Sequence, residues 1–164
     1  NAPEKRKEAW AFMMAGGAVY DNLAWSFAND DMSGMGLNTS GRQRTGKAVW
    51  GQLEILQQAM ADFDFINAAP LDSASKLDGM DIYGLGINGK DYMMYWLKKK
   101  EASPATWNCP LPDGKYLLKW IDPSNGQATG EQTIQSEKGH AVIKIPSFNK
   151  DQVLRIKHFS KSDK

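Results

Sequence analysis

The sequence has 164 residues, of which 41% are hydrophobic and 24% are charged, so it can form a folded core and is not intrinsically disordered. The formal net charge is +1, and the only basic blocks are residues 97–101 and the Lys-rich tail, which argues against nucleic-acid binding. No apolar run approaches the ~20 residues of a membrane span, and the single cysteine, Cys109, excludes an intrachain disulfide.

The first expected element is a helix over residues 3–15. Pro3 suits the first turn of a helix, and Gly16 and Gly17 end the helix as a C-cap does. The residues on its apolar face are Ala9, Trp10, Met13 and Met14. The charged opening NAPEKRKEAW is not a signal peptide, so we expect a mature, trimmed or internal start.

Residues 18–25, AVYDNLAW, are predicted to form a short buried strand. A loop rich in Gly, Ser, Asn and Asp follows over 28–46, and a second helix is expected over 47–63, where apolar residues recur at steps of three and four. The strand has no sheet to join within the first 70 residues. Its neighbours are therefore expected in the β part, in another copy, or in a part of the protein outside this chain.

After Pro70 the apolar pattern alternates with a period of two, which is typical of strands. The expected strands are 80–87, 92–99, 115–121, 130–136, 140–145 and 153–159, separated by turn sequences such as DPSNG. On 115–121, alternation places Tyr116, Leu118 and Trp120 on one face and Leu117, Lys119 and Ile121 on the other. The pattern predicts an antiparallel sandwich, with a boundary between the two parts near residues 68–77.

Three stretches resemble one group of glycoside hydrolases: RKEAWAFMMAGGAVYDNLAWSF, VWGQLEILQQAMADFDFINAAP, and LPDGKYLLKWIDPSNGQATG with IPSFNKDQVLRIK. The group comprises the apiosidase-like and cellulase-like proteins of polysaccharide-degrading bacteria. The first two stretches are similar to the end of their catalytic (β/α)8 barrel, and the last is similar to the small β-sandwich that follows it, which has been labelled a collagen-binding domain.

This resemblance implies an α+β chain in two parts. Residues 1–70 would be the last strand and the last two helices of the barrel, and residues 71–164 the antiparallel β-sandwich. It also implies a secreted or periplasmic protein that acts on a polysaccharide or glycoside, with no cofactor and no metal. The implied partners are the carbohydrate substrate and the missing N-terminal part of the barrel, with neither nucleic acid nor membrane.

If residues 18–25 are strand eight, their C-terminal end lies on the face where barrel active sites are built. The predicted substrate-binding residues are then Tyr20, Asp21, Asn22 and Trp25. The related proteins usually have Gly where this chain has Asp21. Each residue also has a structural alternative: Trp25 in the core, Tyr20 with its hydroxyl bonded to a neighbour, and Asp21 and Asn22 in a turn.

Retaining glycosidases use two carboxylates roughly 5–5.5 Å apart, and the resemblance places them on barrel strands four and seven. Both would precede Asn1, since a complete barrel takes ~250 residues. We therefore expect no catalytic residue in this chain and no hydrolysis by it alone.

The alternative function is a non-catalytic carbohydrate- or protein-binding module, and a third reading is a structural domain without a ligand. The placement of three aromatic residues discriminates the binding module from the structural domain. These residues, Tyr92, Tyr95 and Trp96, alternate between the two faces of one strand, so they cannot all be buried on one side. An exposed aromatic row would favour sugar binding, whereas buried aromatics would favour a sandwich that braces the barrel, which is our expectation.

Five further residues are given structural interpretations. Asp30 and Asp31 do not have the spacing of a Ca²⁺ loop, His140 and His158 are expected on the surface, and Cys109 has no neighbouring base that would make it a nucleophile. The segment GLGING, residues 84–89, is expected to be a hairpin rather than a phosphate-binding loop, because no helix follows it.

Overall fold

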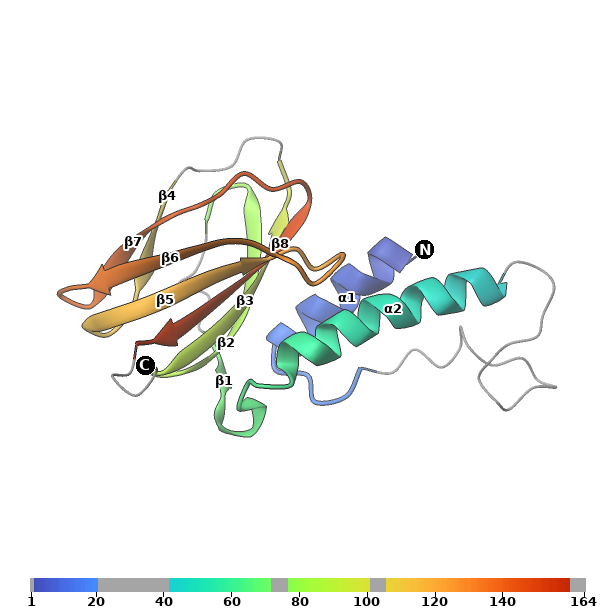
Figure 1. Cartoon of the computed structure of the whole chain (residues 1–164), viewed down its shortest axis with the longest axis horizontal. Helices are drawn as coiled ribbons and strands as arrows, with labels where there is room; N and C mark the ends of the chain where they lie inside the picture. Colours follow the sequence, from blue (N-terminus) through green and yellow to red (C-terminus); the bar gives the residue numbers. More distant parts are fainter. Residues whose placement is uncertain (1, 21–41, 72–76, 101–105, 160–164) are drawn as a thin grey trace.

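The computed structural model describes residues 2–20, 42–71, 77–100 and 106–159. Their order is α1 (Ala2–Met14), α2 (Arg42–Met60), the 3-10 helix η2 (Phe65–Asn67), β1 (Ala69–Pro70), β2 (Met80–Ile87), β3 (Asp91–Lys98), β4 (Thr106–Pro110), β5 (Gly114–Ile121), β6 (Ala128–Ser136), β7 (His140–Lys144) and β8 (Asp151–His158). The chain is thus α+β with mostly antiparallel sheet (Figure 1). Neither described helix has the length and apolarity of a membrane span.

Helix α1 agrees closely with the prediction of a helix over 3–15. It ends where the Gly16 N–H donates to the carbonyl of Met13 and the Gly17 N–H donates to the carbonyl of Phe12. Gly16 has a φ of +92°, a left-handed conformation that glycine adopts without a side-chain clash. The predicted apolar face is buried at Ala9, Trp10 and Met14 and partly buried at Met13.

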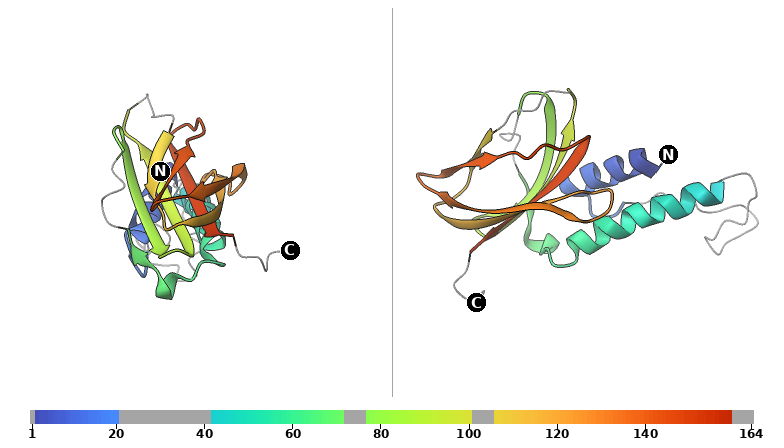
Figure 2. Two further views of the ribbon diagram at one scale, coloured as in Figure 1. Left: turned by 90° about the vertical axis from the view of Figure 1, so that its left-hand side faces the viewer. Right: turned by 45° about the horizontal axis from the view of Figure 1, so that its top comes forward.

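Helix α2 begins earlier and ends slightly earlier than the predicted 47–63. It lies beside α1, and the two helices cover one face of the larger sheet (Figure 2). Leu56 of α2 and Phe63, in the turn that follows, are buried with α1 and the sheet in one cluster. The helices and the sheet therefore share a hydrophobic core.

In the part of the chain that the structure describes, six strands form one antiparallel sheet in the order β1-β2-β3-β8-β5-β6. Strands β4 and β7 form a separate antiparallel pair whose inward residues Trp107, Cys109 and Ile143 pack in the same cluster as those of the larger sheet. All six predicted strands are present. The two strands absent from the prediction are β1 at the edge of the sheet and β4.

The pattern of β5 confirms the predicted alternation. Tyr116, Leu118 and Trp120 are buried, whereas Leu117 and Lys119 are exposed. The DPSNG sequence forms the turn to β6, in which the Gly126 N–H donates to the carbonyl of Asp122. The segment 84–89 likewise leads into the β2–β3 hairpin, as predicted.

Strand β3 is buried on both faces. Tyr92, Met94 and Trp96 point into the core shared with β4 and β7, and Trp96 makes edge-to-face contacts with Trp107 and Trp120 at centroid distances of 5.1 and 5.5 Å. Met93 and Tyr95 point to the helices, where Tyr95 stacks on Trp10 at 5.9 Å. The aromatic residues of β3 therefore form no exposed row.

The prediction of a buried strand at 18–25 is wrong for the residues that the structure describes. Residues 18–20 form neither a strand nor a helix, and Val19 is 75% exposed. Strand geometry needs a neighbouring strand to satisfy its backbone groups, and none of the described strands pairs with these three residues. Residues 21–25 lie outside the described residues.

A buried polar network joins both helices to the sheet. The Arg6 guanidinium donates two hydrogen bonds to the carboxylate of Asp151, from Nε and Nη2, each 2.9 Å long. The Tyr95 hydroxyl donates to the same carboxylate at 2.9 Å, and Arg6 Nη1 donates to Oε1 of Gln52 at 2.8 Å. Gln52 in turn donates to the carbonyl of Ser124 in the β5–β6 turn. This network, centred on the Arg6 guanidinium, connects five segments: α1, α2, β3, β8 and the β5–β6 turn.

We predict that Arg6→Met lowers the free energy of unfolding by about 3–5 kcal/mol, because it leaves the Asp151 carboxylate buried without its cation. The double variant Arg6→Met/Asp151→Leu should recover much of that loss, since it removes both charges. Urea unfolding at pH 7 measures all variants. Lys5→Met, which breaks an exposed pair with Glu8 on the same helix, is the control and should change little. An unchanged urea midpoint for Arg6→Met would contradict the prediction.

Candidate functional site

Tyr20 is the one predicted substrate-binding residue within the described part of the chain. Its ring lies 5.9 Å from that of Phe12, so the side chain packs along α1. The hydroxyl oxygen is buried and lies close to the Glu8 carboxylate. Burial, together with the charge of the nearby Glu8 carboxylate, raises the pKa of Tyr20. The hydroxyl is therefore protonated at neutral pH and able to donate a hydrogen bond.

The other three predicted site residues, Asp21, Asn22 and Trp25, lie outside the described residues, as do Asp30 and Asp31. The structure therefore leaves the predicted set untested as a set. His140 and His158 are exposed, as expected, and Cys109 is buried. Burial raises the pKa of the Cys109 thiol to about 12, so this thiol stays protonated at neutral pH.

The buried carboxylates of the described residues are engaged by arginines. Asp151 accepts from Arg6 and Tyr95. Burial is the largest single influence and lowers the pKa of Arg6, but the hydrogen bond and the charge of Asp151, with smaller contributions from Tyr95 and Asp122, together raise it. Asp91 accepts two hydrogen bonds from Arg155, at 2.6 and 2.5 Å. Both carboxylates are held in place by arginines, so their role is structural. Among the described residues, no cluster of three or more His, Cys, Asp or Glu side chains could hold a metal ion.

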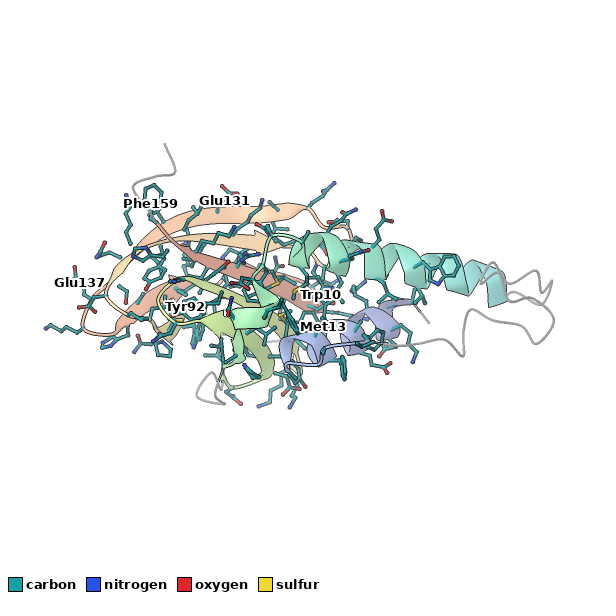
Figure 3. The ribbon with its side chains drawn as sticks, turned by 90° about the horizontal axis from the view of Figure 1, so that it is seen from below. Trp10, Met13, Tyr92, Glu131, Glu137 and Phe159 are labelled. Carbon is teal, nitrogen blue, oxygen red and sulfur yellow. The ribbon has the colours of Figure 1, made fainter. Side chains whose placement is uncertain are left out.

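A groove of about 350 Å³ lies between α2 and the part of the sheet formed by β5, β6 and β8. Its apolar surface comes from Ala59, Leu117 and Ile121. Its polar groups carry both signs and belong to Gln58, Asp62, Lys119, Glu131, Arg155 and Lys157. Figure 3 shows one of them, Glu131, on the outer strand β6, and shows Trp10 where the helices meet the sheet. Small-molecule sites are lined predominantly by apolar and aromatic side chains, whereas polar and charged residues predominate among the described residues of this groove.

Arg155 fixes the wall of this groove. In addition to its bonds with Asp91, it donates from Nη1 to the Asp62 carboxylate at 3.1 Å and from Nη2 to the Asp62 carbonyl at 3.2 Å. Its guanidinium lies 4.9 Å from the centroid of the Phe63 ring. The turn after α2 is therefore anchored to β8, and the groove is rigid on that side. Periodicity did not reveal it, because its residues meet only through tertiary packing.

No known protein family matches the sequence, and no curated protein matches it. The fold, by contrast, is similar to solved structures, and two of these are glycoside hydrolases. A structure described as "Glycoside hydrolase" is 12% identical with a TM-score of 0.55, and the match covers 98% of this chain and 38% of that one. A glycoside hydrolase family 5 protein from Bacteroides vulgatus is 15% identical with a TM-score of 0.47, covering 67% of this chain and 24% of that one.

The likeness to the first of these structures shows that the chain has a glycoside hydrolase-like fold, so the resemblance is confirmed at the level of the fold. The chain spans 38% and 24% of the lengths of the two proteins. It therefore corresponds to a portion of each of them.

We predict that Asp62 contributes stability that depends on pH. Hydrogen bonds from Lys157 and the charge of Arg155, opposed in part by burial, lower the pKa of Asp62 below its ordinary value. The contribution is therefore present above the unfolded-state pKa and is lost as pH falls through the lowered folded-state value. Asp62→Asn should lower the urea midpoint at pH 7, and the difference from the wild type should shrink as pH falls through the lowered pKa of Asp62.

The matched control is Glu54→Gln, an exposed carboxylate on α2 whose side chain accepts from Gln58. It should leave the urea midpoint at pH 7 unchanged. A difference between Asp62→Asn and the wild type that persists undiminished in acid would show that the carboxylate charge is not responsible.

Proposed function

We propose that this chain is the C-terminal portion of a glycoside hydrolase that acts on a polysaccharide or glycoside by the retaining mechanism. The observation that carries the proposal is the likeness in fold to a glycoside hydrolase over 98% of this chain. The retaining mechanism is an analogy with the group that the sequence resembles. A secreted or periplasmic location belongs to the same proposal, because a polysaccharide substrate lies outside the cytoplasm.

In this proposal α1 and α2 are the last two helices of a (β/α)8 barrel, and the two sheets are a β-sandwich that braces it. Two observations support this arrangement. The helices pack on the larger sheet through a shared core, and Arg6 and Arg155 add polar connections between the helical part and the sheet. A rigid junction of this kind suits a domain whose role is to hold a catalytic barrel in shape.

The alternative, a carbohydrate-binding accessory module, has less support. Sugar-binding surfaces of β domains commonly use exposed aromatic rings, and the aromatic residues of β3 are buried on both faces. The groove between α2 and the sheet is lined by no aromatic side chain. Bracing is therefore the function of the β part that agrees better with the placement of its aromatic residues.

Substrate contact would fall to Tyr20, Asp21, Asn22 and Trp25, and the acid/base and the nucleophile would come from outside these 164 residues. Tyr20 would donate its protonated hydroxyl to a sugar oxygen, although in this chain that hydroxyl is buried beside Glu8. Trp25 would supply a flat apolar surface for the C–H face of a pyranose ring.

The test compares the 164-residue chain with a protein extended upstream along its reading frame by the ~200 residues or more that a full barrel requires. We predict that the 164-residue chain does not hydrolyse aryl glycosides or polysaccharides and that the extended protein does. Within the extended protein, Trp25→Ala should raise the Kd for a competing oligosaccharide by about 10-fold, because stacking surface is lost. Calorimetry measures the binding, and reducing-sugar release measures the hydrolysis.

The control is Phe159→Ala, which removes a partly exposed aromatic ring from the end of β8. It should leave both hydrolysis and oligosaccharide binding unchanged. Robust hydrolysis by the 164-residue chain alone would falsify the proposal, since it would require a catalytic pair within this sequence.

A further inference from the structure

A second pocket, also of about 350 Å³, lies where α1 passes the end of β3 and the start of β8. There, residues 97–100 run past the end of β3, and residues 149–150 lead into β8. The two segments are joined by a hydrogen bond from the Lys98 N–H to the carbonyl of Lys150, 2.9 Å long. The pocket is lined by Leu97, Asn149 and five lysines: Lys7, Lys98, Lys99, Lys100 and Lys150. Three segments that are distant in sequence thus bring five lysine residues to one hollow.

Neighbouring groups hold most of these ammonium groups in place. The Lys98 ammonium donates to the carbonyl of Phe148 at 2.5 Å and lies 4.7 Å from the centroid of the Phe148 ring. Lys7 pairs with Glu4, Lys99 with Asp81 and Lys100 with Asp78. These pairs are exposed to solvent.

The charges of the pocket do not cancel. Among the described residues, three of its five lysines pair with a carboxylate, and these partners leave a positive excess. Lys98 is bonded to a neutral carbonyl, and Lys150 has no ion pair with any of the described residues, although its charge acts on the Glu4 carboxylate. Like charges near one pocket repel one another, and an anion in the pocket would relieve that repulsion. No carboxylate is among the described lining residues to exclude it.

We propose that this lysine pocket binds the sulfate ester or carboxylate groups of an acidic polysaccharide. Each lysine offers three rotatable donors on a point charge, which accommodates either anion without requiring the planar geometry that arginine demands. The choice of a polysaccharide as the source of the anion rests on the proposed function. The binding itself requires no hydrolysis and no residue of the predicted barrel site.

Three observations favour an acidic polysaccharide over a nucleic acid. Among the described lining residues there is no aromatic ring and no arginine, so bases would find neither a stacking surface nor a fork-shaped donor there. The Phe148 ring contacts the lining residue Lys98, but the Lys98 ammonium already lies over this ring, so a base could not stack on that face. The whole chain has a net charge of only +1, so the lysines form a local pocket rather than part of a basic surface.

The test is isothermal titration calorimetry of the 164-residue chain with three oligosaccharides and a short DNA duplex. The oligosaccharides are a chondroitin sulfate fragment, an oligogalacturonate and a neutral cello-oligosaccharide. We predict binding of the two acidic oligosaccharides, with affinity that falls as salt rises from about 50 to about 300 mM. Binding of the sulfated or of the carboxylated oligomer alone identifies which anion the pocket takes, and either result supports the proposal.

The variant Lys7→Gln/Lys150→Gln removes one charge from α1 and one from the segment before β8, and it keeps the tethered Lys98. It should weaken binding of the acidic oligosaccharides by about 10-fold or more. The matched control is Lys90→Gln/Lys138→Gln, which removes two charges from the β2–β3 and β6–β7 turns and should bind like the wild type. Thermal unfolding of both variants checks that they remain folded.

Three results would overturn the proposal: equal affinity of Lys7→Gln/Lys150→Gln and the wild type, equal affinity for the neutral and the acidic oligosaccharides, or DNA binding as tight as that of the acidic oligosaccharides. The outcome is independent of the hydrolysis test, because none of the described lining residues belongs to the predicted barrel site. A failure of one proposal can therefore be distinguished from a failure of the other.

Discussion

The structure depends on the ion pair between Arg6 of α1 and Asp151 at the start of β8, which is buried between the helices and the sheet. Neither charge could remain in the interior alone, because the desolvation of an unpaired ion costs several kcal/mol. Two parallel hydrogen bonds, with the Tyr95 hydroxyl as a third donor to the carboxylate, satisfy the pair. The geometry also fixes orientation. A bidentate guanidinium allows one rotation of α1 against the sheet, and through Gln52 the same guanidinium positions α2 and the β5–β6 turn.

Strand β3 makes this connection possible because it contributes to two cores. Its even-numbered residues Tyr92, Met94 and Trp96 fill the space between the sheets, and its odd-numbered residues Met93 and Tyr95 face the helices. A strand that is apolar on both sides must be covered on both sides. The helices are therefore needed to cover the second apolar face of the sheet. This requirement is the physical basis for regarding the β part as a brace in the proposed glycoside hydrolase rather than as a separate binding module.

The near-zero net charge conceals a strong segregation of charge. Beside the α2 groove, Arg155 and Lys157 are matched by Asp62 and Asp91 in short ion pairs, so this region stabilises the contact between helix and sheet. At the opposite end of β3, five lysines gather with fewer carboxylates around them. The charges beside the α2 groove pair with one another, whereas those of the lysine pocket are not fully paired among the described residues. The same residue types thus serve stability in one place and, in our proposal, recognition of an anion in the other.

The sequence by itself determined the elements whose pattern is local. The helix ending at Gly16, the alternation along 115–121 and the DPSNG turn follow from backbone geometry and side-chain period over a few residues, and the structure confirms them. Only the tertiary structure decided what lies far apart in the chain: the pairing of β3 with β8, the Arg6–Asp151 pair, the five-lysine pocket and the short strands β1 and β4. Of the predicted site, Tyr20 alone is placed. The physical reason is that local period depends on neighbouring residues, whereas a pairing of residues 6 and 151 depends on the free energy of the whole packed chain.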